Sequence, residues 1–151
     1  MTSIREFLNF VRNLKDNKNK VLSLGKIPEK LAIQLSEDSE IKIVNYEFVI
    51  DVYAVKHILR NHSNSDKERK RGQKNITDED FELIPEIINN PDIVFYDGKN
   101  DLGRDTFQFQ KKIDDKYVII KEVRTGKKQL ALNTMRVIQI KKNQEFSLDS
   151  L

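Results

Sequence analysis

Cysteine is absent from the 151-residue sequence. Without cysteine the chain has no disulfide scaffold, no cysteine-ligated zinc or iron–sulfur site, and no thiol catalysis. Histidine occurs only twice, and neither histidine lies in a cluster with carboxylates at metal-ligand spacing. We therefore expect no bound metal and no other cofactor.

Long apolar runs are also absent. No run approaches the roughly 18 residues that a membrane-spanning helix needs. The N-terminal segment MTSIREFLNF lacks the basic start, apolar stretch and cleavage site of a signal peptide. We therefore expect a soluble protein that is made in the cytoplasm and has no membrane partner. Toxins can leave the cytoplasm by other routes, so delivery to another cell stays open.

Length and composition predict one domain over residues 1–151. Domains typically contain about 100–200 residues, and hydrophobic residues make up 38% of this chain, enough for a modest core. We interpret residues 1–90 as mainly helical, residues 91–142 as an antiparallel sheet and residues 143–151 as a tail. The predicted fold class is α+β, with N-terminal helices packed on a four-stranded antiparallel meander.

Apolar spacing and capping residues predict the helices of the first part. Ser3 and Glu6 form a capping pair at the start of an amphipathic segment. Thr77 and Asp80 repeat this pair, and Asp51 is a suitable N-cap for the segment that follows it. We expect helices over residues 3–15, 28–35, 51–62 and 77–89, and one strand over residues 41–50.

After Pro91 the apolar spacing changes from the helical period to the two-residue period of a strand. Turn-forming residues separate the apolar runs at Gly98–Gly103, at Asp114–Asp115 and at Thr125–Lys127. Such short connections join antiparallel neighbours. We expect strands over residues 93–97, 105–113, 117–125 and 129–140.

Positive charge is concentrated near the end of the chain. Residues 111–142 contain ten basic and three acidic residues, a net charge of +7. Residues 1–110 contain 17 basic and 19 acidic residues, a net charge of −2. A cationic sheet face of this kind is typical of contact with phosphate groups. The alternative interpretation is a solvated, lysine-rich sheet edge that discourages aggregation.

Both histidines belong to the predicted helix over residues 51–62. Five residues of helix turn through about 500°, so His57 and His62 lie about 140° apart around the axis and cannot share a metal ion. His57 lies on the face of Tyr53, whereas His62 lies on the apolar stripe that should face the sheet. Either imidazole could act as an acid or a base near neutral pH. The alternatives are an exposed His57 and a His62 that caps the C-terminus of the helix.

Polar residues interrupt the last two predicted strands. Glu122 and Arg124 are two residues apart and so share a face, while Lys121 points to the opposite face. Thr134 and Arg136 are expected to share the face of the apolar residues that precede them. A cross-strand charge pair and an ordinary strand threonine are the alternative interpretations. With a nearby histidine, however, a carboxylate, a guanidinium and a hydroxyl can cleave a phosphodiester without a metal.

Several ordered motifs carry a family resemblance. They are DVYAVKHILRNH, ERKRGQ, ITDEDF and IPEIINNPD between Asp51 and Asp92, followed by KEVRTGKKQLALNTM near the end. Over about residues 20–140 the sequence resembles the phage-associated nuclease domains of the barnase/EndoU/colicin/RelE-like superfamily. The resemblance implies N-terminal helices on a four-stranded antiparallel sheet. It also implies metal-independent RNA cleavage, in proteins of phages and mobile elements.

The resemblance and the charge pattern together give a set of candidate site residues. The catalytic candidates, carried over by position from the resemblance, are His57, His62, Glu122, Arg124 and Thr134. The RNA-binding candidates are Arg71 and Gln73 from the RGQ segment and Lys121, Lys127, Lys128 and Arg136 from the basic strands and their connection.

Three functions compete on these observations. The first is an RNA endonuclease, a toxin or a phage or mobile-element effector, that cuts by attack of the ribose 2′-OH and leaves a cyclic phosphate. The second is a catalytically inactive RNA- or protein-binding module on the same fold, because a fold does not fix an activity. The third is an interaction protein whose basic sheet binds an acidic antitoxin or immunity protein.

Overall fold

The computed structural model describes residues 3–15, 20–62 and 73–140, apart from the side chains of Asn61 and His62. The predicted α+β class is confirmed, with helices and short strands first and four long antiparallel strands after them. No helix in these ranges is long and apolar enough to cross a bilayer. The predicted tail over residues 143–151 lies outside the described residues.

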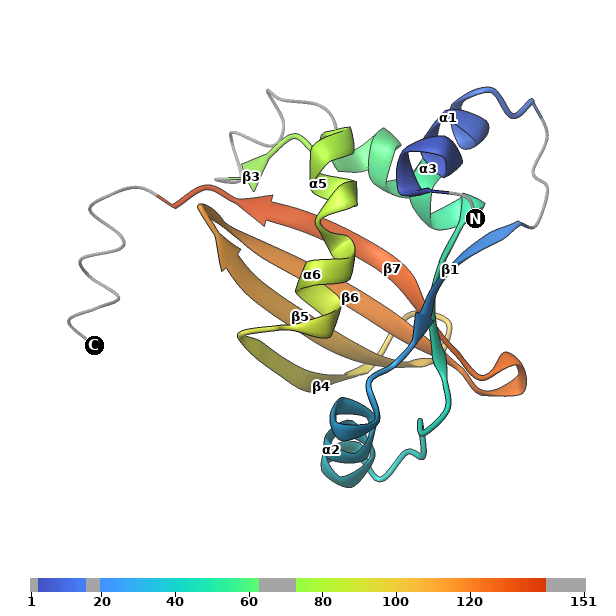
Figure 1. Ribbon diagram of the computed structural model, residues 1–151, viewed down its shortest axis with the longest axis vertical. Helices are drawn as coiled ribbons and strands as arrows, with labels where there is room; N and C mark the ends of the chain where they lie inside the picture. The colour runs from blue at the N-terminus through green and yellow to red at the C-terminus, as the bar shows by residue number, and fades with distance from the viewer. Residues whose placement is uncertain (1–2, 16–19, 63–72, 141–151) are drawn as a thin grey trace.

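The described strands form one seven-stranded sheet (Figure 1). Its order is β1-β2-β7-β6-β5-β4, and the short strand β3 pairs with the C-terminal end of β7. All neighbours are antiparallel except β2 and β7, which run parallel. The strands are β1 (Val21–Lys26), β2 (Glu47–Asp51), β3 (Gln73–Lys74), β4 (Ile93–Lys99), β5 (Asp105–Ile113), β6 (Asp115–Arg124) and β7 (Gln129–Ile138).

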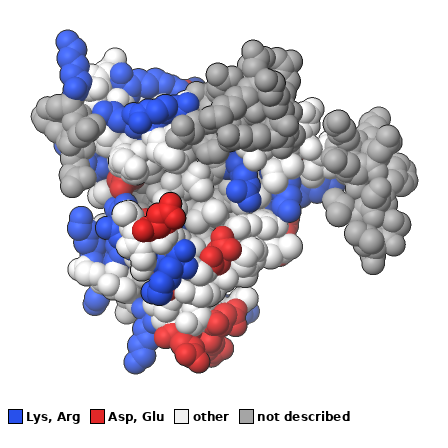
Figure 2. All heavy atoms as spheres, turned by 180° about the vertical axis from the view of Figure 1, so that it is seen from behind, with Lys and Arg blue, Asp and Glu red and all other residues white. Residues whose placement is uncertain are grey.

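The helices gather toward one face of the sheet (Figure 1). Helix α3 packs on β7, α6 on β5 and α2 on β4, while α1 lies against α3 and α5. The helices are α1 (Ile4–Arg12), α2 (Glu29–Ser39), α3 (Val52–His62), α5 (Asp78–Glu82) and α6 (Ile84–Asn89). Seen from behind, the molecule shows an area of uncharged surface with basic and acidic side chains around and within it (Figure 2). We call this side of the sheet the open face.

Side-chain caps fix the starts of three helices, as the sequence predicts. The Ser3 hydroxyl accepts a hydrogen bond of 3.1 Å from the amide three residues on. Asp51 accepts an equivalent bond of 2.7 Å at the start of α3. Thr77 and Asp80 form a reciprocal capping box at the start of α5. The predicted helix over residues 77–89 divides into α5 and α6, because Pro85 has no N–H to continue the hydrogen-bond ladder.

The prediction of a four-stranded sheet is wrong in two respects. Strands β1 and β3, from the part predicted to be mainly helical, also belong to the sheet, and β2 joins the meander through a parallel pair with β7. Such pairing between distant segments leaves no local signal in the sequence. The strand predicted over residues 41–50 begins only at Glu47, because Asn45 has a φ of 69° and turns the chain before it.

The core lies between the helices and the sheet. Alternate residues of the long strands are buried there, among them Phe107, Phe109 and Ile119. The ring of Phe48 from β2 meets that of Phe109 edge-to-face at a centroid distance of 5.9 Å. Burial of one such ring contributes about 2–3 kcal/mol, so this side of the sheet supplies the rigid base on which the open face is built.

A β-bulge decides which face Thr134 occupies. Two consecutive residues of β6 pair with Thr134 and Leu132, so Asn133 between them is the extra residue. Leu132 faces the helices and is buried in the core, whereas Thr134 and Arg136 face the other way. The expectation that these two share the face of the preceding apolar residues is therefore wrong, because the bulge shifts the register by one residue. The shift places Thr134 on the face of Glu122.

Candidate active site

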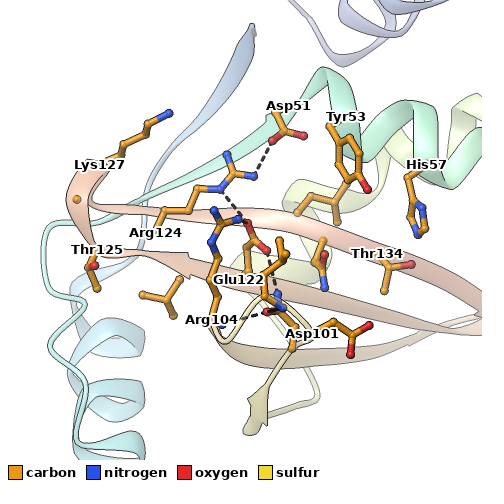
Figure 3. A pocket seen from close by; sticks show the side chains of 16 residues that line it. Asp51, Tyr53, His57, Asp101, Arg104, Glu122, Arg124, Thr125, Lys127 and Thr134 are labelled. Atoms are coloured by element: carbon orange, nitrogen blue, oxygen red, sulfur yellow. Dashed lines mark hydrogen bonds and ion pairs between the residues drawn. The ribbon is translucent and has the colours of Figure 1, made fainter. Parts of the chain in front are cut away.

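A pocket of about 990 Å³ opens where the start of α3, the β4–β5 connection, the end of β6, the turn after it and β7 meet (Figure 3). Ligand-binding pockets typically measure about 300–1,000 Å³, so a nucleotide-sized group fits inside it. No group of three or more histidine, cysteine or acidic side chains that could hold a metal ion occurs among the described residues.

The wall of the pocket is anchored by an ion pair between Asp51 and Arg124. The Nη2 atom of Arg124 donates to Asp51 Oδ2 at 2.6 Å, while Asp51 Oδ1 accepts from the amide of Ala54. One carboxylate thus caps α3 and holds the end of β6. Both side chains are largely buried, so the pair fixes the helix start relative to the sheet.

Glu122 forms the centre of the polar network. It is 3% exposed, and its Oε2 atom accepts hydrogen bonds from Arg124 Nε at 3.0 Å and from Arg104 Nη1 at 2.7 Å. Its Oε1 atom accepts from Asn100 Nδ2 at 3.0 Å. The charge pair given above as the alternative interpretation of Glu122 and Arg124 is therefore present, although within β6, and a second arginine extends it (Figure 3).

The β4–β5 connection is built to present Arg104. The side-chain oxygen of Asn100 accepts hydrogen bonds from the backbone amides of Leu102 and Arg104, both at 3.0 Å. Gly103 has a φ of 75°, a backbone angle that residues other than glycine rarely adopt. The Arg104 side chain is 46% exposed, against 19% for Arg124. Arg104 therefore lies toward the mouth of the pocket and Arg124 in its wall.

Arg124 stays charged in spite of its partial burial. Burial alone would lower its pKa, but the hydrogen bonds and charges of Asp51 and Glu122 outweigh that effect and raise the pKa above its ordinary value. A permanent guanidinium with a planar array of donors is well suited to bind phosphate oxygens.

A pair of aromatic rings on α3 borders the side of the pocket that lies across from the β4–β5 connection. Tyr53 and His57 lie four residues apart on α3, and their rings are stacked with an interplanar angle of 8° and a centroid distance of 6.3 Å. The predicted placement of His57 on the face of Tyr53 is thus confirmed. His57 is half-buried, and among the described side chains it is the imidazole that lines the pocket (Figure 3).

The comparisons with known proteins agree with this chemistry. The family model described as phage-Barnase-EndoU-ColicinE5/D-RelE like nuclease3 (PBECR3) matches residues 25–145, which is 121 of the 151 residues. The chain belongs to this nuclease family. The match begins within β1, so α1 lies outside it. No curated protein and no solved structure matches the chain.

The PBECR3 pocket brings together five of the candidate residues from different parts of the sequence. They are His57, Glu122, Arg124, Lys127 and Thr134. Thr134 is half-buried on β7, and Lys127 is exposed in the turn after β6. An imidazole, a carboxylate, a guanidinium, an ammonium and a hydroxyl therefore face one space, although no local sequence pattern joins them.

The other candidates lie elsewhere or outside the described residues. Lys128 is exposed next to Lys127, and Arg136 is half-buried further along the open face. Gln73 lies in β3 opposite the C-terminal end of β7, with its side-chain oxygen buried and without a hydrogen-bond partner. Arg71 and the side chain of His62 fall outside the described residues.

The structure does not support Lys121 as an RNA contact of the PBECR3 site. Its side chain points into the core and is fully buried, with Nζ 5.3 Å from the centre of the Phe48 ring and 3.4 Å from the Val49 carbonyl oxygen. The prediction that Lys121 points to the face opposite Glu122 is correct, but that face is covered by the rest of the protein. The pKa of Lys121 is lowered to about 7, mainly by burial; the charge of Asp51 raises this pKa and the charge of Arg124 lowers it.

We predict that Lys121 makes stability rise with pH. In the unfolded chain its ordinary pKa is 10.5, so between about pH 7 and pH 10 the unfolded state binds more protons than the folded state. The free energy of unfolding should therefore rise with pH, at up to about 1.4 kcal/mol per pH unit. Denaturant titrations of the wild type and of Lys121→Met from about pH 7 to pH 9.5 test this. Equal slopes for both proteins would contradict it.

Proposed function

We propose that the protein is an endoribonuclease that cuts RNA without a metal, by attack of the ribose 2′-OH on the adjacent phosphate. The observation that carries the proposal is the convergence of His57, Glu122, Arg104 and Arg124 on one nucleotide-sized pocket. Two proton-transfer groups and two guanidinium groups are sufficient for this chemistry. Membership of the phage-associated nuclease family supports the proposal independently of the pocket geometry.

In this proposal Glu122 and His57 are the two proton-transfer groups. The described donors occupy three of the roughly four lone-pair positions of the Glu122 carboxylate, which leaves one for a ribose hydroxyl. A carboxylate is ordinarily ionised at neutral pH and serves as the base, whereas an imidazole can carry a proton there and serves as the acid.

Glu122 takes the proton from the 2′-OH, and the 2′-oxygen forms a bond to phosphorus. The bond from phosphorus to the 5′-oxygen breaks, and His57 gives a proton to the departing oxygen. The products are a 2′,3′-cyclic phosphate and a free 5′-hydroxyl. Arg104 and Arg124 stabilise the negative charge on the phosphorane-like transition state, and the Thr134 hydroxyl donates a hydrogen bond to it.

Cleavage assays in EDTA test the proposed function. The protein is incubated with a single-stranded RNA and with a DNA of the same sequence. We expect cleavage of the RNA alone, with unchanged rate when EDTA is added. Binding of the RNA without cleavage would favour the inactive-module alternative. Binding of an acidic antitoxin or immunity protein with no affinity for RNA would favour the interaction-protein alternative.

We predict that RNA affinity depends moderately on salt. Lys127, Lys128 and Arg104 are the exposed cations at the pocket and beside it, which corresponds to about two to three phosphate contacts. For a single strand the affinity should then fall about 7- to 20-fold between 50 and 200 mM salt. Fluorescence anisotropy with a labelled RNA measures this change. An affinity that does not change with salt would contradict the assignment of these residues to phosphate contacts.

A further inference from the structure

We propose that Tyr53 is a stacking platform for one unpaired nucleobase, which makes single-stranded rather than double-stranded RNA the substrate of this site. The inference deepens the proposed function and rests on it for the position of the scissile phosphate. It is carried by the exposure of the ring, by its place at the pocket, and by the rigidity of its support.

The exposure of Tyr53 has no explanation in the packing of the protein. Tyr53 is 76% exposed, which is the largest exposed fraction among the large hydrophobic residues that the structure describes. The side chain nevertheless lines the pocket, beside the network that holds the arginines (Figure 3). An exposed aromatic ring next to cations is the arrangement by which proteins bind single-stranded nucleic acids, since a base stacks on the ring while phosphates contact the cations.

The backbone segment that carries the ring is anchored before any ligand binds. Tyr53 is the second residue of α3, directly after the helix start that Asp51 caps. The same Asp51 carboxylate pairs with Arg124, so the ring and the phosphate-binding guanidinium are tied to one short segment. The His57 ring lies nearly parallel to the Tyr53 ring, one helical turn further on. A preorganised surface loses little conformational entropy on binding.

This geometry selects an unpaired base. Inside a duplex both faces of each base are covered by its neighbours, so a protein ring can stack only on a base that is splayed out of the helix. The pocket of about 990 Å³ has room for a single nucleotide between α3 and the β4–β5 connection. Stacking is possible for every base, so the platform by itself predicts tolerance of sequence at this position.

The test measures binding to an RNA that cannot be cleaved. Labelled single-stranded oligonucleotides with 2′-O-methyl ribose are titrated with the wild type, Tyr53→Ala, Tyr53→Phe and Phe95→Ala. Phe95 is an exposed aromatic residue of β4 outside the pocket lining and serves as the matched control. Loss of one base stack should weaken the affinity of Tyr53→Ala about 5- to 150-fold. Tyr53→Phe and Phe95→Ala should stay within about twofold of the wild type.

A second probe separates stacking from charge. On an oligonucleotide with an abasic backbone, Tyr53→Ala and the wild type should bind equally, because no base remains to stack. An equal loss on both probes, or no loss on either, would overturn the inference. So would tighter binding of a duplex than of a single strand by the wild type. Because Tyr53 is exposed, its substitution should leave the fold intact, and thermal unfolding of each variant checks this directly.

The outcomes also distinguish the inference from the proposed function. If the wild type binds single-stranded RNA through Tyr53 but never cleaves unmodified RNA, the endonuclease proposal fails and the platform stands. If the wild type cleaves RNA and Tyr53→Ala binds and cleaves as the wild type does, the platform fails and the endonuclease proposal stands.

Discussion

His57→Ala is expected to cleave RNA about 10²- to 10⁴-fold more slowly than the wild type while it stays folded, because removal of one proton-transfer group typically costs this much. The half-buried imidazole lines the pocket and lies outside the core, so the fold should survive its loss. Single-turnover cleavage rates measure the effect. Arg60→Ala is the matched control, since Arg60 is exposed on the same helix outside the pocket lining, and it should cleave at nearly the wild-type rate.

His62→Ala completes this experiment. We predict that at least one of the two histidine variants loses activity on this scale. Loss of a histidine that only caps the C-terminal end of α3 should lower the free energy of unfolding by about 0.3–1 kcal/mol and leave the rate per folded molecule unchanged. Near wild-type cleavage by both variants would show that no imidazole takes part in the reaction.

Arg124→Ala should lower the free energy of unfolding by about 3–5 kcal/mol, the usual cost of removing one partner from a buried ion pair. The substitution leaves Asp51 and Glu122 without their shared cation in the wall of the pocket. Arg104→Ala removes a more exposed guanidinium from the same Glu122 and should cost about 1 kcal/mol or less.

Chemical denaturation of both arginine variants tests this difference. Circular dichroism before the transition shows whether the helices are retained. If the two variants are equally stable, the ion pair of Asp51 and Arg124 does not anchor α3 to the sheet. The triple variant Arg124→Met, Asp51→Asn, Glu122→Gln should regain part of the loss, because it also removes the Asp51 charge that Arg124→Ala leaves unpaired and the Glu122 charge, which then has Arg104 as its remaining cation.

Local sequence signals predicted the parts of the fold that local physics decides. The helix starts at Ser3, Asp51 and Thr77 follow from capping, which involves residues only three apart. The long strands after Pro91 follow from the two-residue period. Strand β1 was not predicted, because its only partner among the described strands is β2. Strand β2 in turn joins the sheet through a parallel pair with β7, a segment distant in the sequence.

The candidate site was also predicted only in part, because local spacing is visible in the sequence and contacts between distant segments are not. The two-residue spacing of Glu122 and Arg124 correctly placed both on one face of β6. The face of Thr134 depended on a bulge at Asn133, which the spacing of apolar residues does not reveal. The burial of Lys121 also depended on segments distant in sequence, because β2 and the helices cover that face.

Arg104 and Asn100 were missed because they lie in a turn, where no periodicity identifies functional residues. A signal was nevertheless present in the register of the β5–β6 hairpin. Thr106 pairs with Glu122, and continuation of that register places Arg104 opposite Arg124. Two cations opposite each other repel, and Glu122 lies where one carboxylate can neutralise both. Hairpin register combined with charge could therefore have predicted the second arginine.

The central claim is that the ribose 2′-OH is the nucleophile, and one measurement tests it most directly. A cleavage site is first mapped on an RNA oligonucleotide in EDTA. The nucleotide on the 5′ side of that site is then replaced by its 2′-deoxy form, with all other residues unchanged. Our account predicts that cleavage at that phosphate stops, while the unmodified oligonucleotide yields a product with a 2′,3′-cyclic phosphate. Continued cleavage at the same phosphate of the 2′-deoxy oligonucleotide would contradict it.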